Sequence, residues 1–367
     1  MRLTIDLGRP LLPEAADSEK RQRPRAIKRH SLRHLVVESA CGLCRIGLLA
    51  ALLAAAPIPE SARAEPVTLS ARPVALNPRD PTQATVGLLT YRGGIEIASP
   101  DGRFGGLSGL VVTPSGDVIS ISDRGFWLIA RLVLDERGYL VGITDGEMGR
   151  LAGPGGMPVG RRQQDAEDIA LLPDGTAIVS FEHDHRLWRY YPSAVPFQGL
   201  VEPVAPPAGI QDLPPNGGIE ALAHLSDGRL LALVEGLSVP GDVAARLGFL
   251  RDRNGAWERL SYVPAPDYLP SGAAGLPNGD ALVLERRFID PVTYEARLTR
   301  VPSAEIKAGA RLSGRELARL ARPLSLDNFE GVAVRPGPTG ETLVYVISDD
   351  NYLPIQRTLL LQFVLRE

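Results

Sequence analysis

A pattern of two short apolar runs joined by a turn that ends in glycine occurs five times in this chain of 367 residues. Val and Ile on both sides of a turn rich in Gly, Pro and Asp predict a β-hairpin. The five stretches are FGGLSGLVVTPSGDVISISDRG (104–125), DAEDIALLPDGTAIVSFEH (165–183), GGIEALAHLSDGRLLALVEG (217–236), PSGAAGLPNGDALVLERR (270–287) and DNFEGVAVRPGPTGETLVYVISDDN (327–351). A hairpin that returns every 51 to 59 residues restricts the chain to a repeating, all-β architecture.

Each hairpin has a Ser or Glu where its first strand begins, the opening residue, and an acid where its second strand ends, the closing residue. The opening residues are Ser108, Glu167, Glu220, Ser271 and Glu330. The closing residues are Asp123, Glu182, Glu235, Glu285 and Asp349. Because the two ends of a hairpin are neighbours in space, we expect opening and closing residues to meet at one end of each hairpin.

The repeat predicts a β-propeller, with further apolar runs such as residues 126–134 supplying outer strands. The N-terminal strands and the C-terminal strand (residues 358–365) are expected to complete a sixth blade and close the ring without a free edge. Residues 303–322 read as a helix, because Ser313 and Glu316 form a possible capping box before Leu317 and Leu320. A β-sandwich or a solenoid is the alternative fold.

The first 64 residues form a leader that precedes the single propeller domain, residues 65–367. A basic region (20–33), a short apolar run (46–56) and the motif Ala62-Arg63-Ala64 follow the layout of a secretory signal peptide. The sequence therefore predicts a periplasmic or secreted protein with no stable membrane span after cleavage. An uncleaved anchor is the alternative.

Cleavage after Ala64 would change the composition of the mature chain in two ways. Both cysteines, Cys41 and Cys44, would be lost, which excludes disulfides, thiolate metal sites and a cysteine nucleophile. The mature chain would hold 29 Lys and Arg against 37 Asp and Glu. An acidic exported protein is a poor candidate for nucleic-acid binding. We expect a monomer whose partner is a small anionic substrate.

In a propeller the acids of all blades would converge at one mouth of the central channel. Converging carboxylates repel one another unless they are protonated, paired with cations or bound to a metal. Oxygen ligands without cysteine favour Ca²⁺ first, and Mg²⁺ or Mn²⁺ second. The predicted metal ligands are Asp123, Glu167, Glu220, Glu330 and Asp349. The predicted catalytic residues are Glu220, Glu330, Arg124 and Arg286.

Both arginines would hold an anionic substrate, since guanidinium binds phosphate or carboxylate bidentately. Arg287 and Arg357 lie near closing residues as well. The alternative is that Arg–carboxylate pairs fasten the blades together.

Other motifs give weaker signals. His183 and His185 could share one strand face, as a transition-metal site would need, but a surface strand explains them as well. Ser108 lacks the G-x-S-x-G pattern of a nucleophile elbow, and Ser271 occupies the matching place in another hairpin. No P-loop or dinucleotide-binding glycine motif is found, which argues against nucleotide cofactors.

The five stretches in their order and spacing resemble the phytase-like domain family, also described as having the esterase-like activity of phytase. The resemblance covers roughly residues 86–365. It implies a β-propeller in an exported bacterial protein and a link to phosphoester or ester hydrolysis, and phytase propellers bind several Ca²⁺ ions through carboxylates at one mouth. We therefore expect a Ca²⁺-dependent hydrolase of phosphate esters or related esters. The alternative is a non-catalytic propeller that binds a ligand or protein partner at its acidic mouth.

Overall fold

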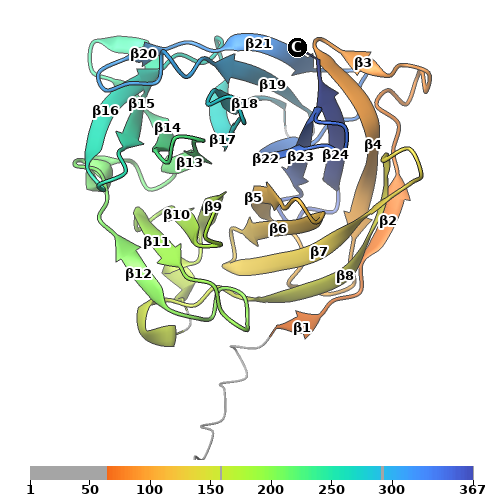
Figure 1. Cartoon of the computed structure of the whole chain (residues 1–367), viewed down its shortest axis with the longest axis horizontal. Coiled ribbons are helices and arrows are strands. Elements are labelled where there is room, and N and C mark those ends of the chain that lie inside the picture. Colours follow the sequence, from red (N-terminus) through yellow and green to blue (C-terminus); the bar gives the residue numbers. More distant parts are fainter. Residues whose placement is uncertain (1–63, 158, 291–292, 367) are drawn as a thin grey trace, which may run out of the picture. The chain divides into compact units, whose positions relative to one another are not determined.

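The structure is a computed structural model that describes residues 64–157, 159–290 and 293–366. Residues 1–63 of the predicted leader (1–64) lie outside the described residues, and so do both cysteines. The described residues form a ring of antiparallel blades around a central channel (Figure 1), and two of the blades are joined edge to edge into one larger sheet. Among the described residues, no helix has both the length and the apolar character needed to cross a membrane.

Each blade of the ring has four strands that follow one another from the centre outward. The first blade holds β5 (Leu107–Val112), β6 (Asp117–Ser122), β7 (Phe126–Leu134) and β8 (Leu140–Arg150). The second holds β9 (Ala166–Leu171), β10 (Ala177–Phe181), β11 (Arg186–Tyr190) and β12 (Val201–Val204). The third holds β13 (Ile219–His224), β14 (Leu230–Val239), β15 (Asp242–Arg251) and β16 (Trp257–Tyr262).

The last two blades follow the same plan. The fourth holds β17 (Leu269–Gly275), β18 (Ala281–Asp290), β19 (Thr293–Val301) and β21 (Arg315–Leu320). The fifth holds β22 (Asn328–Pro336), β23 (Thr342–Asp349), β24 (Thr358–Leu365) and β4 (Leu89–Ala98). Short strands at the rim are β1 (Glu65–Pro66), β2 (Ser70–Pro73), β3 (Thr85–Val86) and β20 (Arg311–Leu312). The connections include the 3₁₀ turns η2 (Pro154–Gly156), η3 (Arg161–Gln163) and η4 (Ile210–Asp212).

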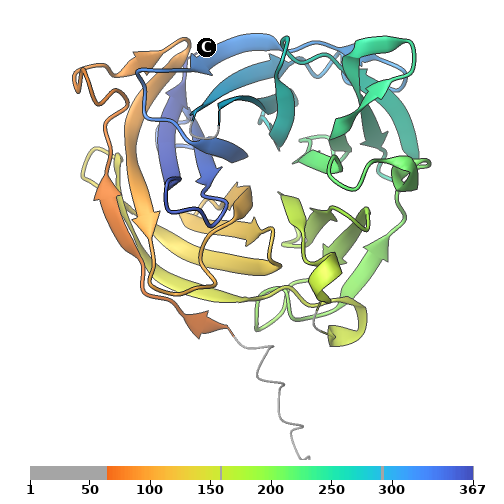
Figure 2. The ribbon, with the colours of Figure 1, turned by 180° about the vertical axis from the view of Figure 1, so that it is seen from behind.

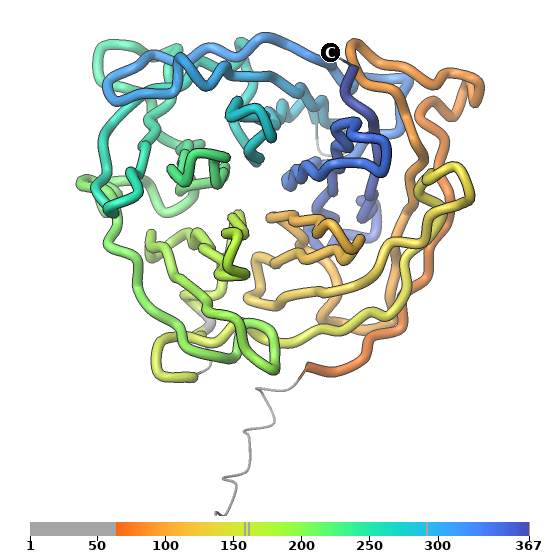
Figure 3. The backbone as a smooth tube through the Cα atoms, viewed as in Figure 1, coloured from red at the N-terminus to blue at the C-terminus, as the bar shows by residue number. Residues whose placement is uncertain are grey.

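The innermost strands form a closed circuit, which confirms the propeller and corrects its blade number. β5 lies beside β9, β9 beside β13, β13 beside β17, β17 beside β22, and β22 beside β5. The described residues thus form five blades, and the sixth blade that we expected is wrong. The N-terminal strand β4 pairs with the C-terminal strand β24 as the outer edge of the fifth blade. The ring is closed by both ends of the domain, as expected (Figure 3).

Apolar side chains from neighbouring blades pack against each other in five clusters. Between the first and second blades, Trp127 packs with Val179 and Trp188. Between the third and fourth, Leu231 packs with Val283. Equivalent clusters lie between the second and third, the fourth and fifth, and the fifth and first blades. Burial of apolar surface between blades, at about 25 cal/mol per Å², therefore stabilises every step around the ring.

The helix expected in residues 303–322 is wrong. β21 occupies this stretch and pairs with β19 as the outer strand of the fourth blade. The register shifts between Leu298 and Thr299, which leaves Leu317 unpaired, and Leu317 and Leu320 are both buried in the same apolar cluster. The bulge produces a spacing of three between apolar residues, and this spacing imitates a helix. Most other predicted strands are confirmed, and β7 and β24 match their predicted ranges.

Candidate functional site

The opening residues lie on a β-bulge in every inner strand. The register between the first and second strands shifts at Ser108 and Gly109 in β5, at Glu167 and Asp168 in β9, at Glu220 in β13, at Ser271 in β17 and at Glu330 in β22. A bulge places two residues opposite one on the partner strand and re-aims a side chain. The repeated bulge therefore places an opening residue at the same position in all five blades. We call this end of the channel the mouth. The inner strands surround the channel in the view from behind as well (Figure 2).

The closing residues follow the second strand of each hairpin at the same end. The amide N–H of Asp123 donates to the carbonyl of Gly106 at 3.0 Å, and that of Glu182 donates to the carbonyl of Asp165 at 2.8 Å. Glu235 donates in the same way to Gly218 at 3.1 Å. Opening and closing residues thus meet at the mouth, as the hairpin argument predicted.

Glu285 is the exception and does not belong to the mouth. In the fourth blade Pro270 lies opposite Glu285, and Leu269 lies opposite Arg286. In the fifth blade Asn328, two residues before the opening residue, lies opposite Asp349. The closing position of the fourth blade is therefore held by Arg286.

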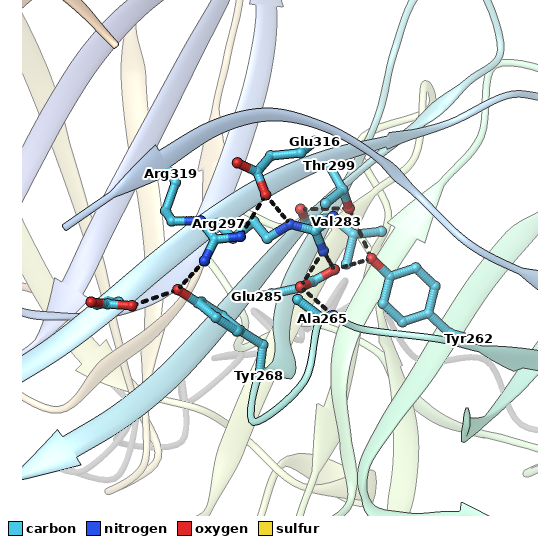
Figure 4. Close-up of polar contacts among 10 residues, drawn as sticks. Tyr262, Ala265, Tyr268, Val283, Glu285, Arg297, Thr299, Glu316 and Arg319 are labelled. Atoms are coloured by element: carbon cyan, nitrogen blue, oxygen red, sulfur yellow. Dashed lines mark hydrogen bonds and ion pairs between the residues drawn. The ribbon is translucent and has the colours of Figure 1, made fainter. Parts of the chain in front are cut away.

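Glu285 points into the blade and is fully buried (Figure 4). Its carboxylate lies 2.7 Å from Nη1 of Arg297, accepts a hydrogen bond from the Tyr262 hydroxyl and accepts another from the Ala265 amide at 3.1 Å. Tyr262 belongs to the third blade. Glu285 thus joins two blades and has a structural role.

Three glutamates converge at the mouth between the second and third blades. Oxygen atoms of Glu167, Glu182 and Glu220 lie within 4.8 Å of one another. Burial raises the pKa of Glu220 well above its usual range, and the neighbouring Glu235 and Glu182 raise it further. Burial also raises the pKa of Glu167, and the charge of the nearby Glu220 raises it further. We call these three residues the glutamate triad.

Backbone amides hold one member of the triad in place. Oε1 of Glu182 accepts hydrogen bonds from the amides of Gly217 and Gly218, the latter at 3.1 Å. Burial raises the pKa of Glu182, although these amides act against the shift. Within the described part of the chain, no ion pair joins a triad member to Lys or Arg.

A second group shares Glu182 with Asp165 and His183, whose possible ligand atoms also lie within 4.8 Å of one another. Nε2 of His183 lies 2.9 Å from Oδ2 of Asp165. His185, in contrast, is buried, and its Nε2 contacts the carbonyl of Pro214 at 2.9 Å. The two histidines therefore contact different residues and do not form a joint metal site.

Arg286 lies at the mouth between two acids. Its Nη1 is 2.8 Å from Oε1 of Glu330, and its Nη2 is 2.8 Å from Oε1 of Glu235. Burial would lower the pKa of Arg286, but the charges of Glu330 and Glu235 raise it overall. Burial raises the pKa of Glu330 to about 7, although Arg286 pulls it down.

Asp123 and Asp349 lie at the mouth where the fifth blade meets the first. Burial raises the pKa of Asp123 to about 7, and the charges of Asp165 and Asp350 add to the shift. Burial likewise raises the pKa of Asp349, with Glu330 as its largest charged neighbour. The exposed Arg124 stacks on the ring of Tyr352, with its Cζ 3.3 Å from the ring centroid. This guanidinium is held at the mouth by a cation–π contact rather than by a carboxylate.

Arg287 and Arg357 do not join the mouth acids. Arg287 lies 3.5 Å from Asp267 and 3.9 Å from Glu295. Arg357 lies 3.5 Å from Asp327 and 3.6 Å from Glu96. Both arginines thus form Arg–carboxylate pairs, but the pair of Arg287 with Glu295 lies within the fourth blade and that of Arg357 with Glu96 within the fifth, so neither of these two pairs fastens one blade to another.

Asp168 forms the floor of the mouth. Its buried carboxylate accepts hydrogen bonds from the amides of Leu222 at 2.7 Å, Ile169 at 2.8 Å and Ala273 at 3.4 Å. These amides belong to the inner strands of three blades, so this side chain bridges the channel. A cavity of about 130 Å³ lies farther along the channel from the mouth. It is lined by the later residues of all five inner strands, among them His224.

The geometry sorts the predicted site residues into three groups. Glu167 and Glu220 belong to the triad, Glu330 pairs with Arg286, and Asp123, Asp349 and Arg124 lie between the fifth and first blades. Sequence reasoning left Glu182, Asp165 and Glu235 out of the predicted ligand set. Oxygen atoms from three converging carboxyl groups are the ligands that a hard divalent cation takes, so the triad fits the predicted metal.

Comparisons with known proteins gave one family match and several distant structural neighbours. No curated protein matches the chain. Solved structures resembling it include a gluconolactonase from Xanthomonas campestris (13% identity, 83% of this chain and 96% of that chain, TM-score 0.39). An endo-arabinase from Bacteroides thetaiotaomicron gives 10% identity, 70% and 93% coverage and a TM-score of 0.45. A PQQ-bound aldose sugar dehydrogenase from Streptomyces coelicolor is 15% identical, with 81% of this chain and 99% of that chain covered and a TM-score of 0.38.

These likenesses are too distant to bear on activity. The model of the phytase-like family, described as esterase-like activity of phytase, matches residues 102–352. The match covers more than half of the chain and includes all five hairpins. The chain belongs to the phytase-like family.

Proposed function

We propose that this chain is a metal-dependent hydrolase of phosphate esters or related esters, with Ca²⁺ as the first candidate and Mg²⁺ or Mn²⁺ as alternatives. The observation that carries the proposal is the glutamate triad, in which three carboxylates converge without a Lys or Arg partner among the described residues. Such a cluster is costly unless protons or a cation neutralise it. Membership of the phytase-like family supports ester hydrolysis as the reaction class.

The triad would hold the metal, and Asp165 could complete its ligand set. A bound metal would lower the pKa of a water molecule and offset negative charge that develops in the transition state. Glu330 and Asp123 have pKa values of about 7, so each can accept or release a proton near neutral pH. They are our candidates for proton transfer during hydrolysis.

The two predicted substrate-binding arginines differ in what they can offer. Arg286 already contacts Glu235 and Glu330, and its charge is largely matched. Arg124 is exposed and rests on Tyr352, so its guanidinium edge is open to a phosphate or carboxylate group. We therefore assign Arg124 to substrate binding and Arg286 to the architecture of the mouth.

Calorimetric titration of the chelated chain with Ca²⁺ tests the metal. Binding should raise the melting temperature, because a ligand at about 100 times its dissociation constant stabilises the folded state by about 2.7 kcal/mol. A panel of phosphomonoesters, phosphodiesters and carboxylic esters then tests the reaction. If Ca²⁺ produces neither heat nor a thermal shift, and Mg²⁺ and Mn²⁺ also fail, the proposal is wrong.

Glu220→Gln tests the assignment of the triad. The substitution should abolish the thermal shift caused by Ca²⁺ together with any metal-dependent activity. In EDTA the variant should melt at a higher temperature than the parent, because Gln removes one of three mutually repelling carboxylates. Glu258→Gln, at an exposed position of β16, is the matched control and should change neither property. Unchanged Ca²⁺ affinity in Glu220→Gln would show that the metal lies elsewhere.

A non-catalytic role in binding a protein partner is the second candidate, and exposed apolar side chains at the mouth favour it. Phe288 and Ile289 lie near the end of β18, and Leu353 and Ile355 lie in the β23–β24 connection. Both segments follow closing positions. Replacing Phe288 and Ile355 by Ser should leave turnover of a small soluble ester unchanged if the chain is an enzyme. Two results together would favour the binding role: no turnover of the ester panel by the wild-type chain, and loss of partner capture in the doubly substituted chain.

We also propose that the chain is exported and acts as a monomer in the periplasm or outside the cell. Cell fractionation and N-terminal sequencing of the expressed full chain test this proposal. The expected mature N-terminus is Glu65. A chain that stays in the cytoplasm with its leader intact would contradict export.

A further inference from the structure

The closing positions of the five blades carry four acids and one arginine. In blade order they are Asp123, Glu182, Glu235, Arg286 and Asp349. The strand register gives Arg286 the same backbone place as Asp349, opposite the residue that lies two positions before the opening residue. The fourth blade thus has a fixed positive charge at the backbone position where each of the other four blades has a carboxylate.

The guanidinium of Arg286 is surrounded by oxygen atoms from the two flanking blades. Glu235 of the third blade and Glu330 of the fifth each lie 2.8 Å from one of its nitrogens. Oδ1 of Asn328 accepts a hydrogen bond from Nη1 at 2.9 Å, and the Asn328 amide nitrogen in turn donates to Oε1 of Glu330 at 2.7 Å. Two carboxylates and one amide oxygen are the ligand types that hard cations take.

The mouth therefore has two clusters of oxygen atoms that differ in what neutralises them. No ion pair joins the glutamate triad to an arginine among the described residues, although Glu220 is near enough for its charge to raise the pKa of Arg286; Glu235 and Glu330 contact that arginine directly. Neither group of converging metal ligands in the described chain includes Glu235 or Glu330. The guanidinium, a planar and bulky cation, occupies the space that their oxygens would otherwise share.

We propose that Arg286 is a built-in cation that fills a second cation site of the mouth, so that the wild-type chain binds one divalent metal ion at the triad and none at Glu235, Asn328 and Glu330. Removal of the guanidinium opens this second site to Ca²⁺. The first part of this inference rests on the proposed function, whereas the second part, which concerns Arg286 alone, does not. The consequence for the enzyme is that chelators and competing ions can empty the triad but leave the positive charge beside it in place.

Equilibrium dialysis with ⁴⁵Ca²⁺ on the full chain, after chelation, measures the number of ions bound. We expect one Ca²⁺ per wild-type chain and two per chain for Arg286→Ala. Arg286→Gln, which keeps much of the side-chain length but removes the charge, should also bind two. Arg286→Lys keeps a cation and should bind one. The matched control is Arg131→Ala, which removes an arginine 2.8 Å from Asp117 in an exposed pair away from the mouth and should bind one.

The variants separate this inference from the proposed function. Equal Ca²⁺ numbers in wild type and in folded Arg286→Ala would overturn the inference, and so would two ions in the wild-type chain. If Arg286→Ala does not fold, Arg286→Gln decides by the same count. No ion in wild type together with one in Arg286→Ala would reject the metal of the proposed function and retain the cation role of Arg286.

Discussion

Asp123 and Glu330 are the mouth carboxyl groups whose pKa values reach about 7. Burial is the first cause in both, and it favours the neutral form in the folded chain. A group whose pKa is higher in the folded state than in the unfolded state binds more protons when folded, so stability falls as pH rises between the two values. The buried triad residues Glu167 and Glu220 shift in the same direction.

The metal-free chain should therefore lose thermal stability as the pH rises from about 4 to about 7, the window between the unfolded and folded pKa values of Asp123 and Glu330. Thermal melts in EDTA across this range would measure the trend. Saturating Ca²⁺ should remove much of it, because a cation replaces the protons as the neutralising charge. A melting temperature in EDTA that rises steadily across this window would contradict the assigned pKa shifts.

At the residue scale, the sequence predicted where the acids gather but mistook one of them. Counting seven residues beyond the turn glycine leads to Asp123, Glu182 and Glu235 in the first three hairpins, and the same count from Gly279 leads to Arg286. That count is the signal that distinguishes Arg286 from Glu285. No comparable signal marked Glu182 as a partner of Glu167 and Glu220, because their convergence depends on how bulges in two adjacent blades aim the side chains.

At the scale of the strands, Glu285 and Arg297 fasten β18 to β19 inside the fourth blade, and Tyr262 extends the contact to the third (Figure 4). Loss of one member of a buried ion pair leaves an uncompensated charge and costs about 3–5 kcal/mol. We expect Arg297→Met to destabilise the chain by roughly this amount in urea denaturation, with Ca²⁺ binding per folded chain unchanged.

The double variant Glu285→Met/Arg297→Met provides the matched control for this prediction. Replacing both charges by apolar side chains of similar length should recover much of the lost stability, since no buried charge is left alone. If the single and double variants were equally unstable, packing rather than charge would explain the loss. If Arg297→Met abolished Ca²⁺ binding in a folded chain, Glu285 would have to be assigned to the metal site at the mouth.

The strands that the sequence predicted best are those whose apolar runs are bounded by clear turns, such as β7 and β24. It failed where a bulge altered the pattern. In β21 one unpaired residue, Leu317, changes the alternation of two into a spacing of three, and the stretch reads as a helix. The bulges at the opening residues were equally invisible, because the residues that form them are different: Ser-Gly, Glu-Asp, Glu, Ser and Glu.

At the scale of the whole ring, the repeat predicted a propeller but not the number of its blades. The sequence contains five hairpins, and each needs two outer strands. It does not show that the outermost strand of the last blade, β4, comes from a segment more than 200 residues before β22. Without that pairing the terminal strands are left over, and a sixth blade is the simplest way to place them. Long-range pairing of this kind leaves no local pattern in the sequence.

The closing pair of strands should govern the stability of the complete ring. β24 lies between β23 and β4, with Leu361 opposite Val346 on one side and Gly94 on the other. Leu361→Pro would remove a ladder hydrogen bond from this central strand, and the buried carbonyl that loses its partner costs about 1–3 kcal/mol. Since the apolar clusters link every blade to the next, the loss should lower the midpoint of one cooperative urea transition rather than unfold the fifth blade alone. Glu136→Pro, in an exposed turn between β7 and β8 where proline fits the second position, should leave the midpoint unchanged. A Leu361→Pro chain that unfolds in two separate steps would show that the blades are energetically independent.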